Sequence, residues 1–273
     1  MNPEPDAPSP AVPTEAIRAY DDIFVPALFH PWACHLAGAL APRPGGWALD
    51  VGCGPGTVAR VLAACVGPRG AVAAVDTNPA MLTMAVEKPE VRGAPITYRH
   101  GEAADLGLPD DCMDGAACQQ VLQFVPDLPA ALAEIRRVLK PGAPVASLVW
   151  AGLSDNPLFE GLCHAVTDVL GPAAGEAFAH PWHLDGHTLT EALALAGFTA
   201  VTACPRTLPA MFAGGPTDVF RFFGFSAVGD TLRTLDPTGR ADLYQATCLH
   251  LAPFVHHGTV YADTTATLLL AHA

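Results

Sequence analysis

The chain has 273 residues, of which 14 are lysine or arginine and 27 are aspartate or glutamate, for a formal net charge of −13. Proteins that bind nucleic acid gather Lys and Arg against the phosphates, so this charge balance disfavours a DNA or RNA substrate. A chain of this length can bury the core of one large domain, or of a domain with a lid.

Residues 1–13 are rich in proline and lack the basic and apolar regions of a signal peptide, so we expect a disordered tail. No apolar run approaches the ~18 residues of a membrane span, which predicts a cytoplasmic protein without membrane contact. The eight cysteines are dispersed and form no Cys-x-x-Cys pair, which indicates free thiols rather than disulfides or a metal site. Five of them lie in apolar surroundings and are expected to be buried: Cys34, Cys65, Cys118, Cys163 and Cys248.

Strands and helices alternate from Trp47 onwards, the pattern of a doubly wound, mostly parallel sheet. The first strands are expected at Trp47–Val51, Ala71–Asp76, Ile96–His100, Gly115–Gln119 and Pro144–Trp150. Three helices are expected between them, one ending near Val66, one from Pro79 to about Lys88 and one from Leu128 to Lys140. Asn78 and Asp127 are the expected N-caps of the second and third helix.

After Trp150 the pattern loosens. The expected elements are a helix at Phe159–Leu170, an irregular link at Gly171–His183, a helix to Ala196 opened by a Thr188/Glu191 capping box, a sixth strand at Ala200–Cys204 and a last β-rich segment at Val260–Leu270. The long insert before that last segment includes Phe220, Phe222, Phe223 and Phe225 and a predicted helix at Gly239–Ala252. Such an insert is commonly a lid over a small-molecule site, and ordinary core packing is the alternative.

The most informative segment is 47–57, a short apolar strand followed by a glycine-rich turn and the start of a helix. Gly52, Gly54 and Gly56 alternate along the turn, and glycine allows the backbone to press against a ligand. The helix start adds free N–H groups and a positive dipole end. A dinucleotide fingerprint would need its third glycine at Thr57, and no phosphate-loop lysine follows. The segment therefore predicts a cofactor site of another kind.

With Asp50 before it, this turn resembles motif I of the class I S-adenosylmethionine (SAM)-dependent methyltransferases. Three more segments resemble that family: residues 100–110 its Gly-Asp-Ala-x-x-Leu-Pro stretch, residues 119–127 its motif IV, and residues 137–142 its Arg-x-Leu-Lys-Pro-Gly sequence. The chain is similar to the small-molecule members, such as those of ubiquinone and menaquinone biosynthesis. The resemblance implies a seven-stranded Rossmann-like sheet with an antiparallel last strand and helical lid insertions.

Asp76 ends the second expected strand, where an acid can accept both hydrogen bonds of a ribose diol. The resemblance implies that Glu102 and Ala103 bind the adenine, with Asp105 as an alternative acid because Glu102 stands where Asp is commoner. It also implies that Tyr20 closes over the methionine end. The cofactor-binding residues expected are Tyr20, Asp50, Gly52, Gly54, Gly56, Asp76, Thr77, Met81, Glu102, Ala103 and Gln119.

The sequence pattern does not identify a general base. His180 and His183 have a suitable side chain and fall in a segment expected to belong to the lid. Gln123 stands where related enzymes often carry His, and a Gln can orient a substrate without taking its proton. We take His180, His183 and Gln123 as the catalytic candidates, with no metal.

The expected function is transfer of a methyl group from SAM to a small, fairly apolar metabolite of the kind made in secondary metabolism, with S-adenosylhomocysteine as the other product. A cyclase or isomerase that binds SAM without methyl transfer is the first alternative, and a non-catalytic SAM-binding protein the second. The expected division of the chain is a tail at 1–13, an N-terminal helical lid at 14–46, a SAM-binding core at 47–150, and the rest of the sheet with helical substrate-lid insertions at 151–273.

Overall fold

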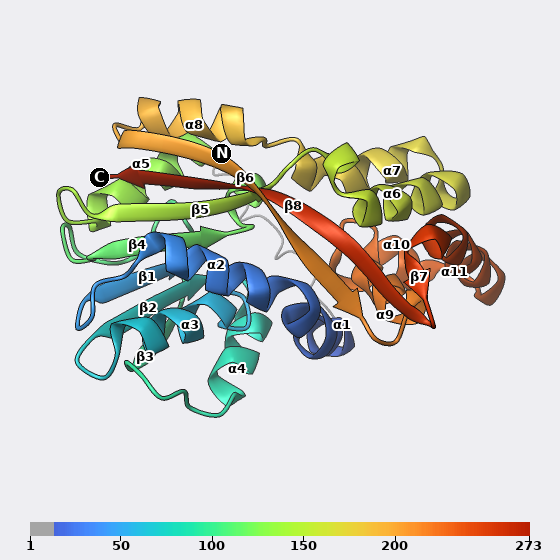
Figure 1. Ribbon diagram of the computed structural model, residues 1–273, viewed down its shortest axis with the longest axis horizontal. Coiled ribbons are helices and arrows are strands. Elements are labelled where there is room, and N and C mark those ends of the chain that lie inside the picture. The colour runs from blue at the N-terminus through green and yellow to red at the C-terminus, as the bar shows by residue number, and fades with distance from the viewer. Residues whose placement is uncertain (1–13) are drawn as a thin grey trace, which may run out of the picture.

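A computed structural model of the protein describes residues 14–273, so the expected tail at 1–13 lies outside the described residues. Its strands are β1 (Trp47–Val51), β2 (Ala71–Asp76), β3 (Ile96–His100), β4 (Gly115–Gln119), β5 (Pro144–Trp150), β6 (Thr199–Phe212), β7 (Val255–His256) and β8 (Thr259–His272). They form one sheet in the order β3-β2-β1-β4-β5-β8-β6, with the short β7 paired to β8 (Figure 1). Strands β1 to β5 run parallel and β8 runs antiparallel to both of its long neighbours. The predicted Rossmann-like fold is confirmed.

Helices cover both faces of the sheet, as its apolar strands require. On one face lie α2 (His30–Leu40), α3 (Thr57–Val66) and α4 (Pro79–Glu87), and on the other α5 (Leu128–Val138) and α8 (Gly186–Leu195). The two predicted N-caps are confirmed, since the Asn78 side chain accepts from Ala80 N–H and the Asp127 side chain from Ala130 N–H. The carboxyl ends of the parallel strands therefore meet at one edge of a sheet that is packed on both sides.

The N-terminal helix is one long element in three parts: α1 (Thr14–Ala19), the π-helical η1 (Tyr20–Phe29) and α2. Pro26 lies inside η1, where its missing N–H interrupts the ordinary helical ladder. By length and composition alone residues 15–40 could cross a membrane, contrary to the sequence expectation of no such stretch. Buried helices of water-soluble proteins pass the same test, and Trp32 of this helix is buried with its indole N–H bonded to Thr264 Oγ1 at 3.1 Å.

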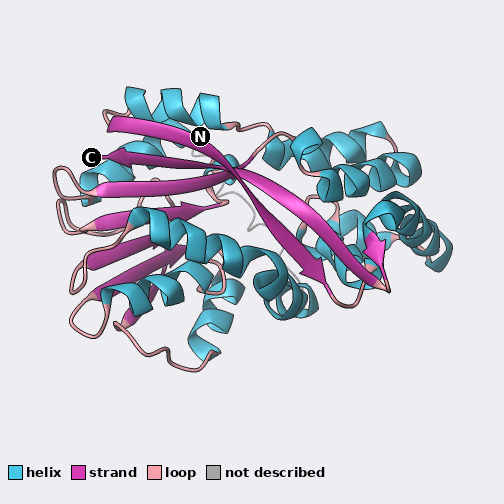
Figure 2. Cartoon of the chain, viewed as in Figure 1, coloured by secondary structure: helices cyan, strands magenta, loops and turns pink. Residues whose placement is uncertain are grey.

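Strands β6 and β8 are longer than predicted, with 14 residues each. Beyond the last pairing with β5 they continue as a two-stranded ribbon, whose register ends at Phe212 opposite Val260 (Figure 2). Pro205 and Pro209 lie in β6. Because proline is uncommon inside strands, the sequence pattern did not predict this part of β6 as a strand. Proline is tolerated there because β6 is an edge strand.

The ribbon carries a helical lobe at its far end (Figure 1). The lobe contains α6 (Pro157–Leu170), α7 (Pro172–Ala179), η4 (His180–Trp182), α9 (Pro216–Phe220), η5 (Arg221–Phe225), α10 (Gly229–Thr234) and α11 (Pro237–Leu251). Phe220 and Phe223 are buried in its core, whereas Phe222 and Phe225 are half-buried and pack edge-on against Phe24 of η1. The buried residues of the insert therefore belong to one hydrophobic core with those of the N-terminal helix.

Three local expectations are wrong. The segment at 171–183 is not an irregular link, because it forms α7 and η4. The Thr188/Glu191 capping box does not form, since α8 begins earlier and the Asp185 side chain accepts from Thr188 N–H at 2.7 Å. Of the five cysteines expected to be buried, Cys34 and Cys65 are exposed; all eight cysteines are free thiols.

Candidate active site at the carboxyl edge of the sheet

The glycine-rich turn after β1 requires its glycines for two different reasons. Gly52, Gly54 and Gly56 all have positive φ, at 67°, 51° and 80°. A Cβ on Gly52 would lie 2.3 Å from a methyl of Val121, and one on Gly56 would lie 2.4 Å from the Tyr98 hydroxyl. A Cβ on Gly54 would meet no atom within 4 Å. The turn is thus packed tightly at both ends and faces open space at its centre.

Asp76 at the end of β2 is held by the backbone. Its Oδ2 accepts from Gly54 N–H at 2.7 Å, and its Oδ1 accepts from Asn78 N–H at 2.8 Å. Each carboxylate oxygen keeps a further lone pair for an external donor. Asn78 is the N-cap of the following helix, so Asp76 and Asn78 both act at the same helix start.

Asp50 lies deeper, at the end of β1, and is 1% exposed. Its Oδ2 accepts from Ala59 N–H at 2.8 Å, whereas its Oδ1 is buried without a partner among the described residues. Burial raises the pKa of this carboxyl well above its usual range, and the neighbouring Asp76 raises it further. The Oδ1 atom therefore keeps free hydrogen-bonding capacity in the interior of the protein.

Tyr20 comes to this edge from the N-terminal helix. Its ring stacks on Phe29 with centroids 4.7 Å apart and meets Phe225 of the lobe edge-on at 5.0 Å. Burial raises the pKa of its hydroxyl, and the nearby carboxylates raise it further, those of Asp76, Asp21 and Asp50. The phenol therefore stays protonated in a region of negative potential.

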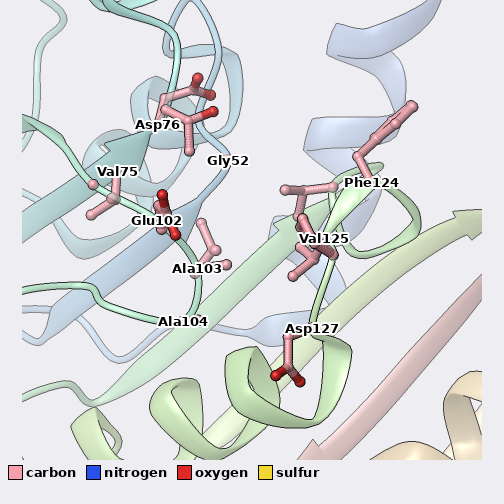
Figure 3. A pocket seen from close by; sticks show the side chains of 14 residues that line it. Gly52, Val75, Asp76, Glu102, Ala103, Ala104, Phe124, Val125 and Asp127 are labelled. Atoms are coloured by element: carbon pink, nitrogen blue, oxygen red, sulfur yellow. The ribbon is translucent and has the colours of Figure 1, made fainter. Parts of the chain in front are cut away.

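A pocket opens beside Asp76, between the ends of β2 and β3 and the segment after β4 (Figure 3). Glu102 and Ala103 lie with Asp76 on one side of it, and Phe124, Val125 and Asp127 lie on the other. Its lining is Val51, Gly52, Val75, Asp76, Thr77, Gly101, Glu102, Ala103, Ala104, Val121, Phe124, Val125, Pro126 and Asp127. This brings together the sequence-predicted Gly52, Asp76, Thr77, Glu102 and Ala103.

Sequence reasoning missed the opposite wall of this pocket. Val121 and Val125 are half-buried in it, and Phe124 is 61% exposed, a high value for a large apolar side chain. The sequence signal that could have predicted this wall is the group of apolar residues directly after the end of β4. Asp105, the alternative acid, lines a separate hollow with Arg99 and His100, although Glu102 borders both hollows.

The remaining predicted residues lie around the pocket rather than in its lining. Gln119 Nε2 donates to Phe29 O at 3.0 Å and so joins β4 to the N-terminal helix. Gln123 is buried and donates to Gln120 Oε1 at 2.8 Å. Met81 lies half-buried on α4 and is not part of the pocket lining.

His180 and His183 are exposed on and just after η4. One ring nitrogen of His183 lies 3.0 Å from His180 O, and the buried Trp182 between them anchors the segment. Neither histidine lines the pocket, although η4 packs against η2 (Leu122–Phe124) in the wall. Within residues 14–273 no cluster of His, Cys, Asp and Glu has the arrangement of a metal site.

Comparison with known proteins identifies relatives of this chain. The family model described as Methyltransferase domain matches residues 49–146. A 2-phytyl-1,4-naphtoquinone methyltransferase of Synechococcus elongatus is 40% identical over 110 residues, which are 40% of this chain and 47% of that protein. A nocamycin O-methyltransferase of Saccharothrix syringae is 33% identical over 192 residues, 63% of this chain and 66% of that protein. The chain thus covers about half the length of the first of these relatives.

Solved structures share the fold at low sequence identity. A phosphoethanolamine N-methyltransferase 2 of Haemonchus contortus, in complex with SAM, has a TM-score of 0.60 at 17% identity and covers 95% of this chain and 57% of its own. The YcgJ protein of Bacillus subtilis has a TM-score of 0.59 at 17% identity, over 89% of this chain and 98% of its own. Residues 49–146 thus match a methyltransferase domain, and the relatives and the fold of the chain are those of class I SAM-dependent methyltransferases of the small-molecule type.

Proposed function

We propose that this protein transfers a methyl group from SAM to a small, fairly apolar metabolite and releases S-adenosylhomocysteine. The observation that carries the proposal is the pairing of Asp76 with the glycine-rich turn, beside a pocket at the carboxyl edge of the sheet. Ligands of open α/β sheets bind at this edge. The comparisons support the cofactor, since structures of this fold include complexes with SAM and S-adenosylhomocysteine.

The residues present fit SAM along its length. The Asp76 oxygens would accept from the ribose hydroxyls, and Glu102 with Ala103 would bind the adenine against the wall formed by Val121 and Val125. The methionine end would lie beside the open face of Gly54, towards Tyr20 and Gln119. The Asp76 carboxylate makes this region negative, which suits the positively charged sulfonium and ammonium groups.

Bound SAM supplies a methyl group on a positively charged sulfur. The protein residues have to exclude water and hold the acceptor in line with that group. Tyr20 and Phe225, in contact across the gap between the N-terminal helix and the lobe, are placed to exclude water. We propose that Gln123 helps to orient the acceptor through its amide, a group that takes no proton.

This arrangement favours catalysis by positioning. His180 and His183 stay the candidate bases, because the segment that carries them packs against the pocket wall. If proton removal by either imidazole were required, the His180→Ala or His183→Ala variant would lose about 10²- to 10⁴-fold in kcat. We expect both variants to keep the wild-type kcat.

We propose an acceptor with an apolar ring system and an oxygen substituent. The named activities of the relatives support this class, a naphthoquinone methyltransferase and an O-methyltransferase, the latter also supporting a place in secondary metabolism. The half-buried Phe222 and Phe225 offer an apolar surface next to Tyr20. Residues 14–46 and 151–273 would cover this acceptor, over a SAM-binding core at 47–150. The free cysteines support the cytoplasm as the compartment.

The test is to incubate the purified protein with SAM and a panel of hydroxylated quinones and phenols, and to measure S-adenosylhomocysteine and methylated product by mass spectrometry. Equal amounts of both products, dependent on the acceptor, would support the proposal. A protein that binds no SAM by calorimetry, or that converts an acceptor without consuming SAM, would contradict it.

A further inference from the structure

One lysine joins three segments around the glycine-rich turn. Lys88 Nζ forms an ion pair with Asp21 Oδ1 of η1 and donates a hydrogen bond to Pro55 O at 2.8 Å. Pro55 stands between Gly54 and Gly56, and Asp21 directly follows Tyr20. Lys88 itself ends α4, which lies beside α1 (Figure 1). A single ammonium group thus connects the N-terminal helix to the turn.

The contact is sheltered from solvent. The side chains of Lys88 and Asp21 are only 17% and 20% exposed. Water and salt screen such a pair less than an exposed one, and removing either partner leaves the other poorly solvated. The Pro55 carbonyl would also lose its side-chain donor.

We propose that Lys88 is a positioning residue for SAM, which keeps the N-terminal helix closed over the cofactor by tying Asp21 to the Pro55 carbonyl. The proposal rests on the proposed function. Tyr20 is carried by the same helical turn as Asp21, and Gly54, whose N–H holds Asp76, precedes Pro55. Lys88 therefore touches neither SAM nor acceptor, but it fixes two segments that do. Its loss would allow the helix to open and SAM to leave faster.

The chain offers a matched control in its only other lysine. Lys140 Nζ pairs with Asp114 Oδ1 at 2.7 Å, and Asp114 also accepts from Trp47 N–H at 2.8 Å. Trp47 begins β1, so this second lysine–aspartate pair lies at the amino edge of the sheet, opposite the glycine-rich turn. A general loss of stability after removal of a lysine would affect both pairs, whereas an effect on SAM would be confined to Lys88.

The experiment compares Lys88→Met, Lys88→Arg and Lys140→Met by SAM calorimetry, by release of radiolabelled SAM into excess unlabelled SAM, and by thermal unfolding. We expect Lys88→Met to release SAM about tenfold faster at a nearly unchanged association rate, and Lys88→Arg to recover part of the retention. Lys140→Met should release SAM at the wild-type rate. Equal release from wild type and Lys88→Met, or equally fast release from Lys140→Met, would overturn the proposal.

Asp21→Asn keeps the test decisive if Lys88→Met does not fold. Asp21→Asn should also speed the release of SAM. Where Lys88→Met does fold, the double variant should release SAM little faster than either single variant, because the two residues act as a pair. Independent, additive effects would count against the proposal. Failure of wild-type protein to bind SAM would instead refute the proposed function, so the two failures are distinguishable.

Discussion

The backbone N–H of Gly54 donates to the Asp76 carboxylate at 2.7 Å, so the turn after β1 and the end of β2 hold each other in place. The second carboxylate oxygen accepts from Asn78 N–H at 2.8 Å. Both donors belong to the backbone of ordered segments, and the carboxylate has little freedom to rotate away. The acid is therefore oriented before a ligand arrives, which lowers the entropic cost of binding.

Replacement of Asp76 by alanine should weaken SAM binding at least about tenfold, equivalent to about 1.4 kcal/mol, because the ribose loses its acceptor. Isothermal calorimetry with SAM measures this directly. Asp185→Ala is the control, because it removes another backbone-bonded carboxylate at a helix start, away from the site. Unchanged SAM affinity in Asp76→Ala would refute the ribose assignment.

A pair of variants can decide whether Glu102 or Asp105 binds the adenine amino group. Glu102 borders the pocket beside Asp76, whereas Asp105 faces the neighbouring hollow with Arg99. We expect Glu102→Ala to weaken SAM binding by at least about tenfold, the lower value of one hydrogen bond to a charged group, and Asp105→Ala to change it by less than about twofold. The reverse order of affinities would transfer the adenine amino group to Asp105.

The parallel half of the sheet could be predicted closely because its strands are short apolar runs bounded by turn residues and helix caps. Strand β1, for example, is buried from Ala48 to Val51 and ends at the glycine turn, so composition and boundary agree. The outer half of β6 could not be predicted this way. Pro205 and Pro209 break the usual strand pattern, and an edge position that tolerates them is a property of the assembled sheet.

The candidate site likewise contains residues that the sequence pattern predicts and residues that depend on the assembled fold. Asp76 and the glycines could be predicted as candidates because the local sequence pattern marks the strand end and the turn in which they stand. Val121 belongs to the pocket because the end of β4 meets the turn after β1, so closely that a Cβ on Gly52 would overlap its methyl groups. Tyr98 supports Gly56 from β3 in the same way. Contacts between segments far apart in sequence cannot be derived from spacing alone.

Asp50 should make the unfolding free energy fall as pH rises. Its folded-state pKa is raised, so the folded protein holds a proton that the unfolded chain, with a pKa near 3.9, releases. Stability is therefore lost as pH rises above about 4 towards the raised pKa. The carboxyls with lowered pKa, Asp114, Glu134 and Asp185, act in the opposite direction but at lower pH.

Urea unfolding of the SAM-free protein between about pH 5 and pH 8 isolates this effect, because the lowered carboxyls stay ionised throughout. Asp50→Asn should show a smaller loss of unfolding free energy across that interval than wild type, since an amide does not titrate. Asp127→Asn, at an exposed N-cap, should keep the wild-type slope. An Asp50→Asn protein with the wild-type slope would show that another group causes the pH dependence.

Alanine at Gly54 and at Gly56 should separate cofactor binding from stability. Both substitutions place a side chain at positive φ, which costs about 1–2 kcal/mol of unfolding free energy. At Gly54 no further cost arises inside the protein, because its Cβ meets open space. At Gly56 the Cβ would also lie 2.4 Å from the Tyr98 hydroxyl, so urea unfolding should show a larger loss.

SAM affinity should follow the opposite order, because the open space beside Gly54 is where we place the methionine end. Under conditions where both variants are folded, calorimetry should find a larger loss of SAM affinity in Gly54→Ala than in Gly56→Ala. Tyr98→Phe should restore part of the stability lost in Gly56→Ala, since the hydroxyl that clashes is a buried group without a hydrogen-bond partner among the described residues. Equal stability losses at the two glycines, or no recovery with phenylalanine, would show that backbone strain alone limits this turn.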